Sequence, residues 1–291
     1  MNPSIRNLSD FSERLSASMP WLDKPADVLH KLYEPMFGEN GIPALKDALY
    51  GTWLGHPLHP AVTDIPIGCW TSSLILDLAG MEKGADITLK AGTIGALGAA
   101  LTGAAQWQDL QELEEPRRLG TLHALMNVAA TACYGVSWVL RDRGARPAGI
   151  ALSLTGYGLA SVSAMIGGDL SYRLGIGVSR VAFDEPSPEW RDALPLGALA
   201  DSALTRVEVD GEAIVLVRDG ERILAASATC THVGGPLDEG ERNGTCVTCP
   251  WHGSEFDLRD GRVVHGPATS PLHAYRTRVR NGTVQIGPLA S

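Results

Sequence analysis

In its first half the chain runs through long apolar stretches separated by short polar breaks, and in its last third apolar and polar positions alternate singly. Residues 91–108, 119–140 and 148–168 contain no Asp, Glu, Lys or Arg, and residues 65–81 contain one Asp. A helix needs about 20 such residues to cross about 30 Å of hydrocarbon. The pattern therefore predicts four membrane helices.

Small residues recur at every fourth position in two of these segments, at 91–103 and at 156–168. Such stripes let helix backbones approach closely in lipid. The alternative is a soluble bundle with a Gly-rich core, but each Gly costs about 1 kcal/mol relative to Ala in a water-exposed helix. The stripes therefore favour the membrane interpretation.

From residue 207 onward the pattern is one of short alternating strands separated by Asp-Gly and Asn-Gly dipeptides. These dipeptides are typical of tight hairpins, so we expect a small antiparallel β domain. The expected fold class is multidomain, with an N-terminal all-α four-helix transmembrane bundle and a C-terminal all-β domain. The expected parts are a surface or amphipathic segment at 1–52, a four-helix membrane domain at 53–175, a Pro-containing linker at 176–200 and the β domain at 201–291.

Composition narrows the function classes. The formal charge of −9 argues against nucleic-acid binding, which needs a basic surface. Five cysteines, an odd number, do not form a disulfide framework. The N-terminus carries acidic residues and no long apolar core, so we expect no secretory or twin-arginine leader and a β domain in a reducing cytoplasm.

Three histidines lie near the ends of the predicted helices. His56 and His59 each precede a proline, and His123 lies one turn into the third helix. With four spans, all three lie on the side of the membrane that carries the β domain. Ionisable groups at membrane depth are costly and usually functional, so these histidines are candidate ligands for haem or another metal, or partners for a quinone. Because no Cys-x-x-Cys-His motif exists, such a haem would be a non-covalent haem b. The alternative is that they only cap helices and bond across the bundle.

The β domain holds a second, denser constellation. Cys230 and His232 form a Cys-x-His pair, and Cys249 and His252 form a Cys-x-x-His pair. Two thiolates and two imidazoles suit a [2Fe-2S] cluster in which the cysteines bind one iron and the histidines the other. A structural zinc site is the alternative, but zinc loops usually separate paired ligands by two or more residues.

Glycines follow both pairs, and they allow the backbone to fold tightly around an inorganic core. The glycines concerned are Gly234, Gly235 and Gly253. Cys246 completes a Cys-x-x-Cys with the second ligand cysteine and is expected to be a strand residue. His265 and His273 lie outside the ligand spacing and are expected to be ordinary polar or structural positions.

The stretch CPWHGSEFDLRDGRVVHGPATSPLHAY, together with CTHVGG, resembles the Rieske family. The resemblance implies that the two Cys and two His named above are the cluster ligands, and that Pro267 belongs to a loop covering the cluster. Rieske proteins of cytochrome bc complexes carry an extra disulfide between the cluster loops, whereas this chain has Gly234 or Gly235 and Trp251 at those places. The ferredoxin-like subtype is therefore favoured, although Ser254 matches a bc-type serine that bonds a cluster sulfide.

The stretches GTWLGHPLHPAVTDIPIGCW, QWQDL, RRLGTLHALMN and GGDLSYRLGIGV resemble an uncharacterised family of bacterial four-helix membrane proteins. That resemblance implies a membrane fold and a bacterial inner membrane location, and it implies no chemistry.

The sequence therefore indicates a membrane-anchored Rieske electron carrier that exchanges single electrons with a redox partner protein or a quinone. The alternative is a membrane oxidoreductase coupling a haem or quinone in the bundle to the cluster, and a third interpretation is a zinc-stabilised interaction module. A self-contained oxygenase is not expected, because the 39 residues after His252 are too few to build a mononuclear iron domain.

Overall fold

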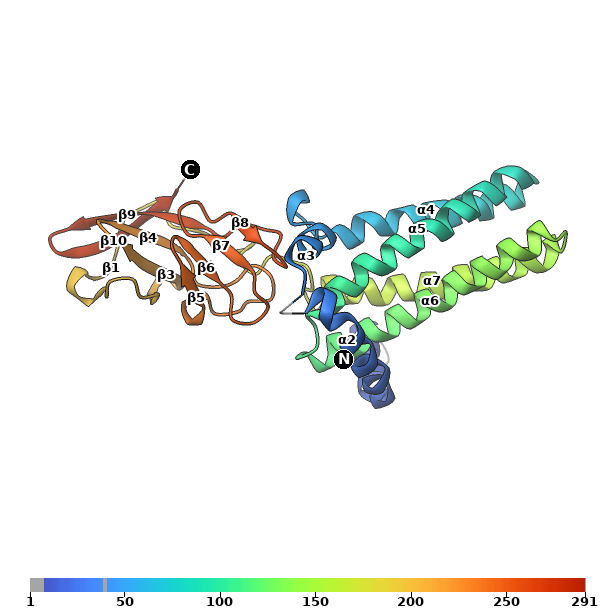
Figure 1. The fold of residues 1–291 in the computed structure, drawn as a ribbon, viewed down its shortest axis with the longest axis horizontal. Helices are drawn as coiled ribbons and strands as arrows, with labels where there is room; N and C mark the ends of the chain where they lie inside the picture. Colours follow the sequence, from blue (N-terminus) through green and yellow to red (C-terminus); the bar gives the residue numbers. More distant parts are fainter. Residues whose placement is uncertain (1–7, 39–40, 291) are drawn as a thin grey trace, which may run out of the picture. The chain divides into compact units, whose positions relative to one another are not determined.

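The structure is a computed structural model that describes residues 8–38 and 41–290. The chain divides into two compact units, a helical unit and a β unit, each drawn in Figure 1. The helical unit is formed by Met1–Ile42 and Leu58–Ile176, and the β unit by Pro43–Pro57 and Gly177–Ser291.

Four long helices form the body of the helical unit. Helix α4 packs mainly against α5, and α6 packs mainly against α7, so that two helical hairpins lie beside one another (Figure 1). The four-helix bundle expected from the apolar runs is confirmed. The helices of this unit in the described residues are α1 (Leu8–Ser18), η1 (Pro20–Leu22), α2 (Asp23–Phe37), α4 (Leu58–Leu78), α5 (Glu82–Gln108), α6 (Glu114–Asp142) and α7 (Arg146–Tyr172).

Two of the long helices, α5 and α7, are long and apolar enough to cross a membrane by length and composition. Helices α4 and α6 do not reach the same mean hydropathy, although each is 21 residues or longer. Aspartates lie within α4, and Glu and Arg residues lie in the end turns of α6.

The bundle exposes many large aliphatic side chains and buries several small and polar ones. Outward-facing residues occur on all four helices and are half or more exposed: Ile65, Ile75, Ile87, Leu97, Val128 and Val162. The buried polar residues of the same helices include Ser73, Thr102, Thr121, Ser137, Ser153 and Ser163. Aliphatic side chains exposed on all four helices are unusual for a bundle in water.

An aromatic pair fills the centre of the bundle. Trp70 of α4 stacks on Tyr134 of α6 with ring centroids 4.0 Å apart and planes within 7°. A Cβ at Gly92 of α5 would lie 2.7 Å from the Trp70 ring, and one at Gly156 of α7 would lie 3.0 Å from the Tyr134 ring. The two glycines therefore admit the stacked rings between the hairpins.

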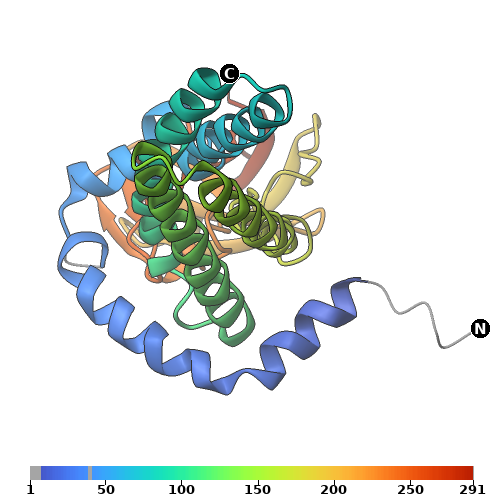
Figure 2. The ribbon, with the colours of Figure 1, turned by 90° about the vertical axis from the view of Figure 1, so that its right-hand side faces the viewer.

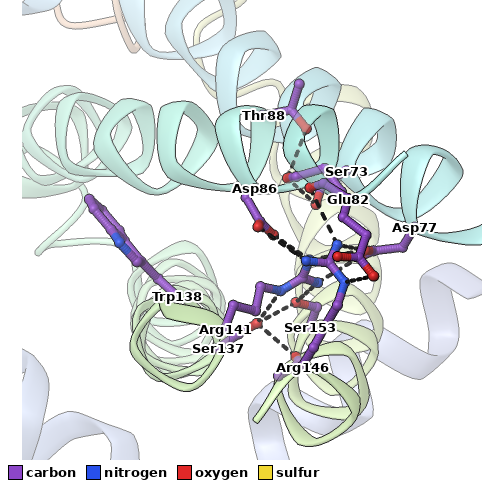
Figure 3. Close-up of polar contacts among 12 residues, drawn as sticks. Ser73, Asp77, Glu82, Asp86, Thr88, Ser137, Trp138, Arg141, Arg146 and Ser153 are labelled. Atoms are coloured by element: carbon purple, nitrogen blue, oxygen red, sulfur yellow. Dashed lines mark hydrogen bonds and ion pairs between the residues drawn. The ribbon is translucent and has the colours of Figure 1, made fainter. Parts of the chain in front are cut away.

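A buried charge network closes the bundle where α4 meets α5 and α6 meets α7 (Figure 3). The side chain of Arg141 is 1% exposed. Its Nη1 donates to Asp77 and Asp86 at 3.0 Å each, and its Nη2 donates to Asp77 at 2.6 Å. Its remaining donors reach the hydroxyls of Ser137 and Ser153. All five N–H groups of this guanidinium are thereby satisfied.

Arg146, at the start of α7, completes the network. It donates to Asp86 Oδ1 at 3.0 Å and Oδ2 at 3.1 Å, and to Asp77 Oδ1 at 2.6 Å. Two arginines and two aspartates, with Glu82 3.6 Å from Arg146, therefore form an ion-pair network that joins all four helices (Figure 3).

Helices α1 and α2 wrap around one end of the bundle (Figure 2). Tyr33 of α2 contacts Trp107 of α5 edge to face at 6.5 Å. Arg118 of α6 forms two hydrogen bonds to the carboxylate of Asp23, at 2.9 and 2.7 Å. These contacts fix α2 against the bundle.

Short antiparallel strands form most of the β unit, as the alternating pattern predicts. Its helical turns in the described residues are α3 (Pro43–Tyr50), η2 (Thr52–Leu54), η3 (Leu196–Ala198) and η4 (Leu237–Glu239). Its strands are β1 (Arg191–Pro195), β2 (Thr205–Val209), β3 (Glu212–Asp219), β4 (Arg222–Ser227), β5 (Glu241–Asn243), β6 (Cys246–Thr248), β7 (Glu255–Asp257), β8 (Val263–His265), β9 (Ala274–Arg280) and β10 (Thr283–Leu289).

The strands form two sheets. The larger has the order β1-β10-β9-β4-β3-β2, and its end strands β1 and β2 also lie near one another, so the sheet is nearly closed. The smaller has the order β5-β6-β7-β8. A core that includes Val215, Leu237, Val247 and Phe256 joins both sheets to the cysteine-bearing loops.

Two segments lie elsewhere than the sequence suggests. Strand β1 lies inside 176–200, the stretch expected to be a linker, where prolines and acidic residues conceal its short pattern. Pro43–Pro57, expected to be divided between the N-terminal segment and the membrane domain, belongs to the β unit.

Candidate metal centre

Two loops of the β unit carry the candidate ligands, and their backbones fold alike. In the first loop the N–H of Gly234 donates to the carbonyl of Cys230, and the N–H of Cys230 donates to the carbonyl of Gly235, at 3.0 and 2.9 Å. The second loop has the same two bonds. The N–H of Gly253 donates to the carbonyl of Cys249 at 3.1 Å, and the N–H of Cys249 donates to the carbonyl of Ser254 at 2.8 Å.

The backbone conformation and the available space explain why glycines follow each Cys–His pair. Gly234 has φ of 92° and Gly253 has φ of 75°. This left-handed region is strained for side chains other than Gly. Gly235 is needed for space, because a Cβ there would lie 2.6 Å from the sulfur of Cys249.

The two cysteines face one another in the interior. Cys230 is 1% and Cys249 is 3% exposed. A hydrogen bond between the two sulfurs lowers the pKa of Cys249 to about 7, and the same bond together with burial raises the pKa of Cys230. The pair can therefore supply thiolate sulfur away from water, as a cluster requires.

The two histidines lie together. The ring centroids of His232 and His252 are 5.1 Å apart, with planes at 89°. Burial, together with repulsion by His252, Lys46 and Arg180, lowers the pKa of His232 to about 3. A neutral imidazole is the form that binds a metal.

Three further expected neighbours of the cluster lie around these loops. Ser254 is fully buried, accepts a hydrogen bond from the N–H of Ala268 at 3.0 Å and hydrogen-bonds the sulfur of Cys230. Pro267 follows a cis peptide bond and is buried. Trp251 lies next to His252, with ring centroids 6.4 Å apart, and is 54% exposed.

Some residues beside the site were not found from the sequence. His265, expected to be an ordinary polar or structural position, hydrogen-bonds Asp47 through Nδ1 at 2.9 Å. Tyr50 contacts His232 edge to face, with ring centroids 6.4 Å apart. Asp47 and Tyr50 belong to α3, far away in sequence, and no spacing pattern indicates them. Cys246 lies in β6, as expected.

Two of the three candidate histidines near the bundle lie together. The rings of His59 (α4) and His123 (α6) are 6.3 Å apart. His59 bonds Thr102 at 3.2 Å, and His123 bonds Asn127 through Nε2 at 3.1 Å. His56 belongs to the β unit and is exposed. Across the described residues, no three His, Cys, Asp or Glu side chains surround one point as ligands of a single ion.

The donor set fits a [2Fe-2S] cluster. Two sulfurs face one another in the interior, and two neutral imidazoles lie together beside them on matching loops. Gly235 leaves open the space beside the Cys249 sulfur that a Cβ would fill. These features are those of the centre in which two His replace two Cys on one iron.

Comparison with known proteins gives two family matches. The model of the Rieske [2Fe-2S] domain matches residues 189–276. The model described as "Predicted membrane protein (DUF2231)" matches residues 55–180. Together they cover the four long helices and most of the strands.

Similar known proteins match about a third of this chain. Ferredoxin CarAc of Metapseudomonas resinovorans is 30% identical over 98 residues, covering 33% of this chain and 92% of the ferredoxin. The cytochrome b6-f complex iron-sulfur subunit of Chlorobaculum tepidum is 28% identical, covering 27% of this chain and 42% of the subunit.

A solved structure, the ferredoxin of carbazole 1,9a-dioxygenase from Nocardioides aromaticivorans IC177, is 29% identical, with a TM-score of 0.33, and the match covers 34% of this chain and 98% of the ferredoxin. The Rieske family model and the near-complete match to ferredoxin CarAc account for the C-terminal part of the chain, and the second family model accounts for the helices before it. The chain therefore belongs to the Rieske [2Fe-2S] family, as an electron-transfer protein in which the Rieske domain is fused to a DUF2231 predicted membrane protein domain.

Proposed function

We propose that this protein is a membrane-anchored Rieske one-electron carrier in which Cys230, His232, Cys249 and His252 hold the [2Fe-2S] cluster. The observation that carries this proposal is the pair of matching loops, each closed by the same two backbone hydrogen bonds. Each loop presents one buried cysteine and one histidine to the same place. When bound, the cluster takes up and gives back one electron at a time.

The residues around the loops have separate tasks in this proposal. Cys230 and Cys249 would supply sulfur in a dry interior to one iron, while the two histidines, which are half-buried, would bind the other iron. Ser254 supports the first cysteine through its hydroxyl and ties the second loop to Ala268. Such a hydrogen bond to sulfur raises the reduction potential of a centre of this type.

The surface of the bundle supports membrane anchoring. Large aliphatic side chains face outward on all four long helices, and the charges of Arg141 and Asp77 are paired internally. Helix α2 also exposes an apolar stripe of Val28, Leu32 and Met36 at spacings of four residues, as a helix lying at a lipid interface does. The lipid bilayer is therefore the proposed environment of the helical unit.

We place the Rieske domain on the cytoplasmic side of a bacterial inner membrane. All five cysteines are unpaired, as expected in a reducing compartment. The proposed electron partner is a redox protein, because a relative such as the naphthalene 1,2-dioxygenase system ferredoxin component of Pseudomonas putida, 26% identical, is by its name part of a redox system.

The test is metal and sulfide analysis with EPR of the dithionite-reduced full chain in detergent. We expect about two irons and about two acid-labile sulfides per chain, together with a rhombic EPR signal. Cys249→Ser and His252→Ala should lose all three. Cys246→Ser and His273→Ala are matched controls and should keep them. Stoichiometric zinc without sulfide would overturn the proposal in favour of an interaction module.

A second candidate function is a membrane oxidoreductase in which a haem or quinone bound in the helical unit exchanges electrons with the cluster. The observation that favours it is the pair of imidazoles of His59 and His123, 6.3 Å apart inside the bundle. A Soret band that His59→Ala or His123→Ala removes identifies haem, and extractable quinone lost in these variants identifies quinone. Protein with neither group is a simple anchor.

A further inference from the structure

A segment of the chain that precedes the bundle packs against the proposed cluster site. Residues 43–57 hold α3 and η2 and belong to the β unit. The carboxylate of Asp47 accepts hydrogen bonds from the N–H of Gly266 at 2.7 Å and from His265 Nδ1 at 2.9 Å. Both donors lie in or beside the loop that contains Pro267.

The contact is close as well as polar. A Cβ at Gly266 would lie 2.7 Å from the hydroxyl oxygen of Thr52, so the glycine backbone itself touches the segment. Tyr50 is 2% and Lys46 is 8% exposed. Both act on His232, Tyr50 through an edge-to-face ring contact and Lys46 through its charge.

A second stretch of chain lies on the same loop. The N–H of Arg180 donates to the carbonyl of Thr231 at 3.2 Å, and Val181 is 2% exposed. The other cluster loop differs, because Pro250 and Trp251 are both exposed there. The two histidines therefore have unequal surroundings, with protein over His232 and an exposed aromatic ring beside His252.

We propose that residues 43–57 are a built-in cover over His232, held in place by Asp47, and that a redox partner protein docks on the Trp251 and His252 side. One electron passes to an oxidised partner, which is thereby reduced, and no bond is made or broken. This inference rests on the proposed cluster site, and it adds which side of that site contacts the partner protein. In it Asp47 is a positioning residue, and Trp251 is the aromatic anchor that protein interfaces favour.

The hydrogen bonds of the cover are tested by hydrogen–deuterium exchange of the full-length protein in detergent, followed on the peptide that contains Gly266. Asp47→Ala should speed exchange there by roughly tenfold, because the N–H loses its charged acceptor. Asp47→Asn keeps one acceptor oxygen and should give a smaller increase. Glu221→Ala, in the β3–β4 turn, removes a negative charge that makes no contact with Gly266 and should change nothing.

A double variant checks that the residues act together. If Asp47 and His265 form one contact, then Asp47→Ala with His265→Ala should exchange no faster than Asp47→Ala alone. Additive effects, or unchanged exchange in Asp47→Ala, would overturn the cover. Because exchange does not depend on electron transfer, an intact EPR signal with unchanged exchange refutes the cover and leaves the proposed function standing.

The docking side is tested by stopped-flow oxidation of the reduced protein with cytochrome c as a protein-sized acceptor and ferricyanide as a small one. Trp251→Ala should slow oxidation by cytochrome c at least threefold and leave oxidation by ferricyanide within twofold. Asp47→Ala should speed oxidation by cytochrome c at least threefold, because a second side becomes accessible. Equal rates for Trp251→Ala and the unaltered protein would overturn the docking side.

Discussion

Replacing Arg141 tests whether the buried charge network holds the two helical hairpins together. Its side chain is 1% exposed and that of Asp77 is 4% exposed, so neither charge has water as a substitute partner. Arg141→Met removes one member and leaves the two carboxylates of Asp77 and Asp86 with Arg146 alone. Removing one partner of a buried ion pair destabilises a protein by about 3–5 kcal/mol. We expect a loss of that size in the free energy of unfolding.

Arg141→Lys separates charge from geometry. Lysine keeps the positive charge but has three donors where arginine has five. At least two of the five hydrogen bonds of Arg141 must then be lost, at about 0.5–1.5 kcal/mol for each. The expected loss is about 1–3 kcal/mol, between the unaltered protein and Arg141→Met.

The assay is SDS-induced unfolding in mixed micelles, with stability taken from the linear dependence of the unfolding free energy on SDS. Arg143→Met is the matched control, because Arg143 is exposed and is the first residue after α6. This substitution should change the free energy of unfolding by less than about 0.5 kcal/mol. The double variant Asp77→Leu/Arg141→Met removes one charge of each sign and leaves Asp86 paired with Arg146, so it should lose less stability than Arg141→Met alone. The reasoning is refuted if Arg141→Met matches Arg143→Met, or if the double variant is additive.

Three further predictions concern the Rieske domain. Gly235→Ala should abolish iron incorporation because its Cβ would lie 2.6 Å from the Cys249 sulfur, whereas Gly197→Ala has open space and should load normally; normal iron content in the first variant contradicts this. Ser254→Ala should lower the reduction potential by roughly 20–60 mV in redox titration followed by EPR, since one lost hydrogen bond of about 0.5–1.5 kcal/mol corresponds to that range for one electron; an unchanged or higher potential refutes the assigned bond. The hydrogen bonds that Asp257 accepts from Arg259 lower the pKa of Asp257 from 3.8 to about 2. The ionised carboxylate therefore stabilises the fold above about pH 4, by up to about 2 kcal/mol, and this contribution is lost as the pH falls toward 2. Asp257→Asn should therefore be less stable than the unaltered protein in urea unfolding at pH 7 and equally stable near pH 2, and a pH-independent difference would rule this out.

The local parts of the site could be predicted from the sequence because they depend on spacing. Cys230 and His232 are two residues apart and Cys249 and His252 three apart, and each pair lies in one loop that a glycine closes. The contact between Asp47 and His265 joins residues 218 positions apart, and nothing in either neighbourhood indicates the other. Spacing rules describe a single loop, and they do not reach a contact that only the folded chain forms.

The helices show the same division. Uncharged runs predict the four long helices, because a run of that length has few other stable structures. Arg141 and Arg146 lie at helix ends, where a count of charges along the sequence treats them as loop charges, but they are paired with Asp77 and Asp86 inside the bundle. Their pairing depends on which helix ends meet, and that information is absent from a count of charges.

The path of the chain bears on how the Rieske domain can move. A single Pro-containing linker after the bundle would tether the domain at one point and let it swing between partners. In the structure the β unit contains Pro43–Pro57 as well as Gly177–Ser291, so the chain passes between the units three times, after Ile42, Pro57 and Ile176. A domain held by three connections loses more freedom than one held by a single flexible linker. For the domain to swing on the last connection alone, residues 43–57 must first leave it, which breaks both hydrogen bonds of Asp47 and uncovers Tyr50. Electron transfer by a freely swinging domain and a stable cover over His232 are therefore alternatives, and the exchange rate at Gly266 distinguishes between them.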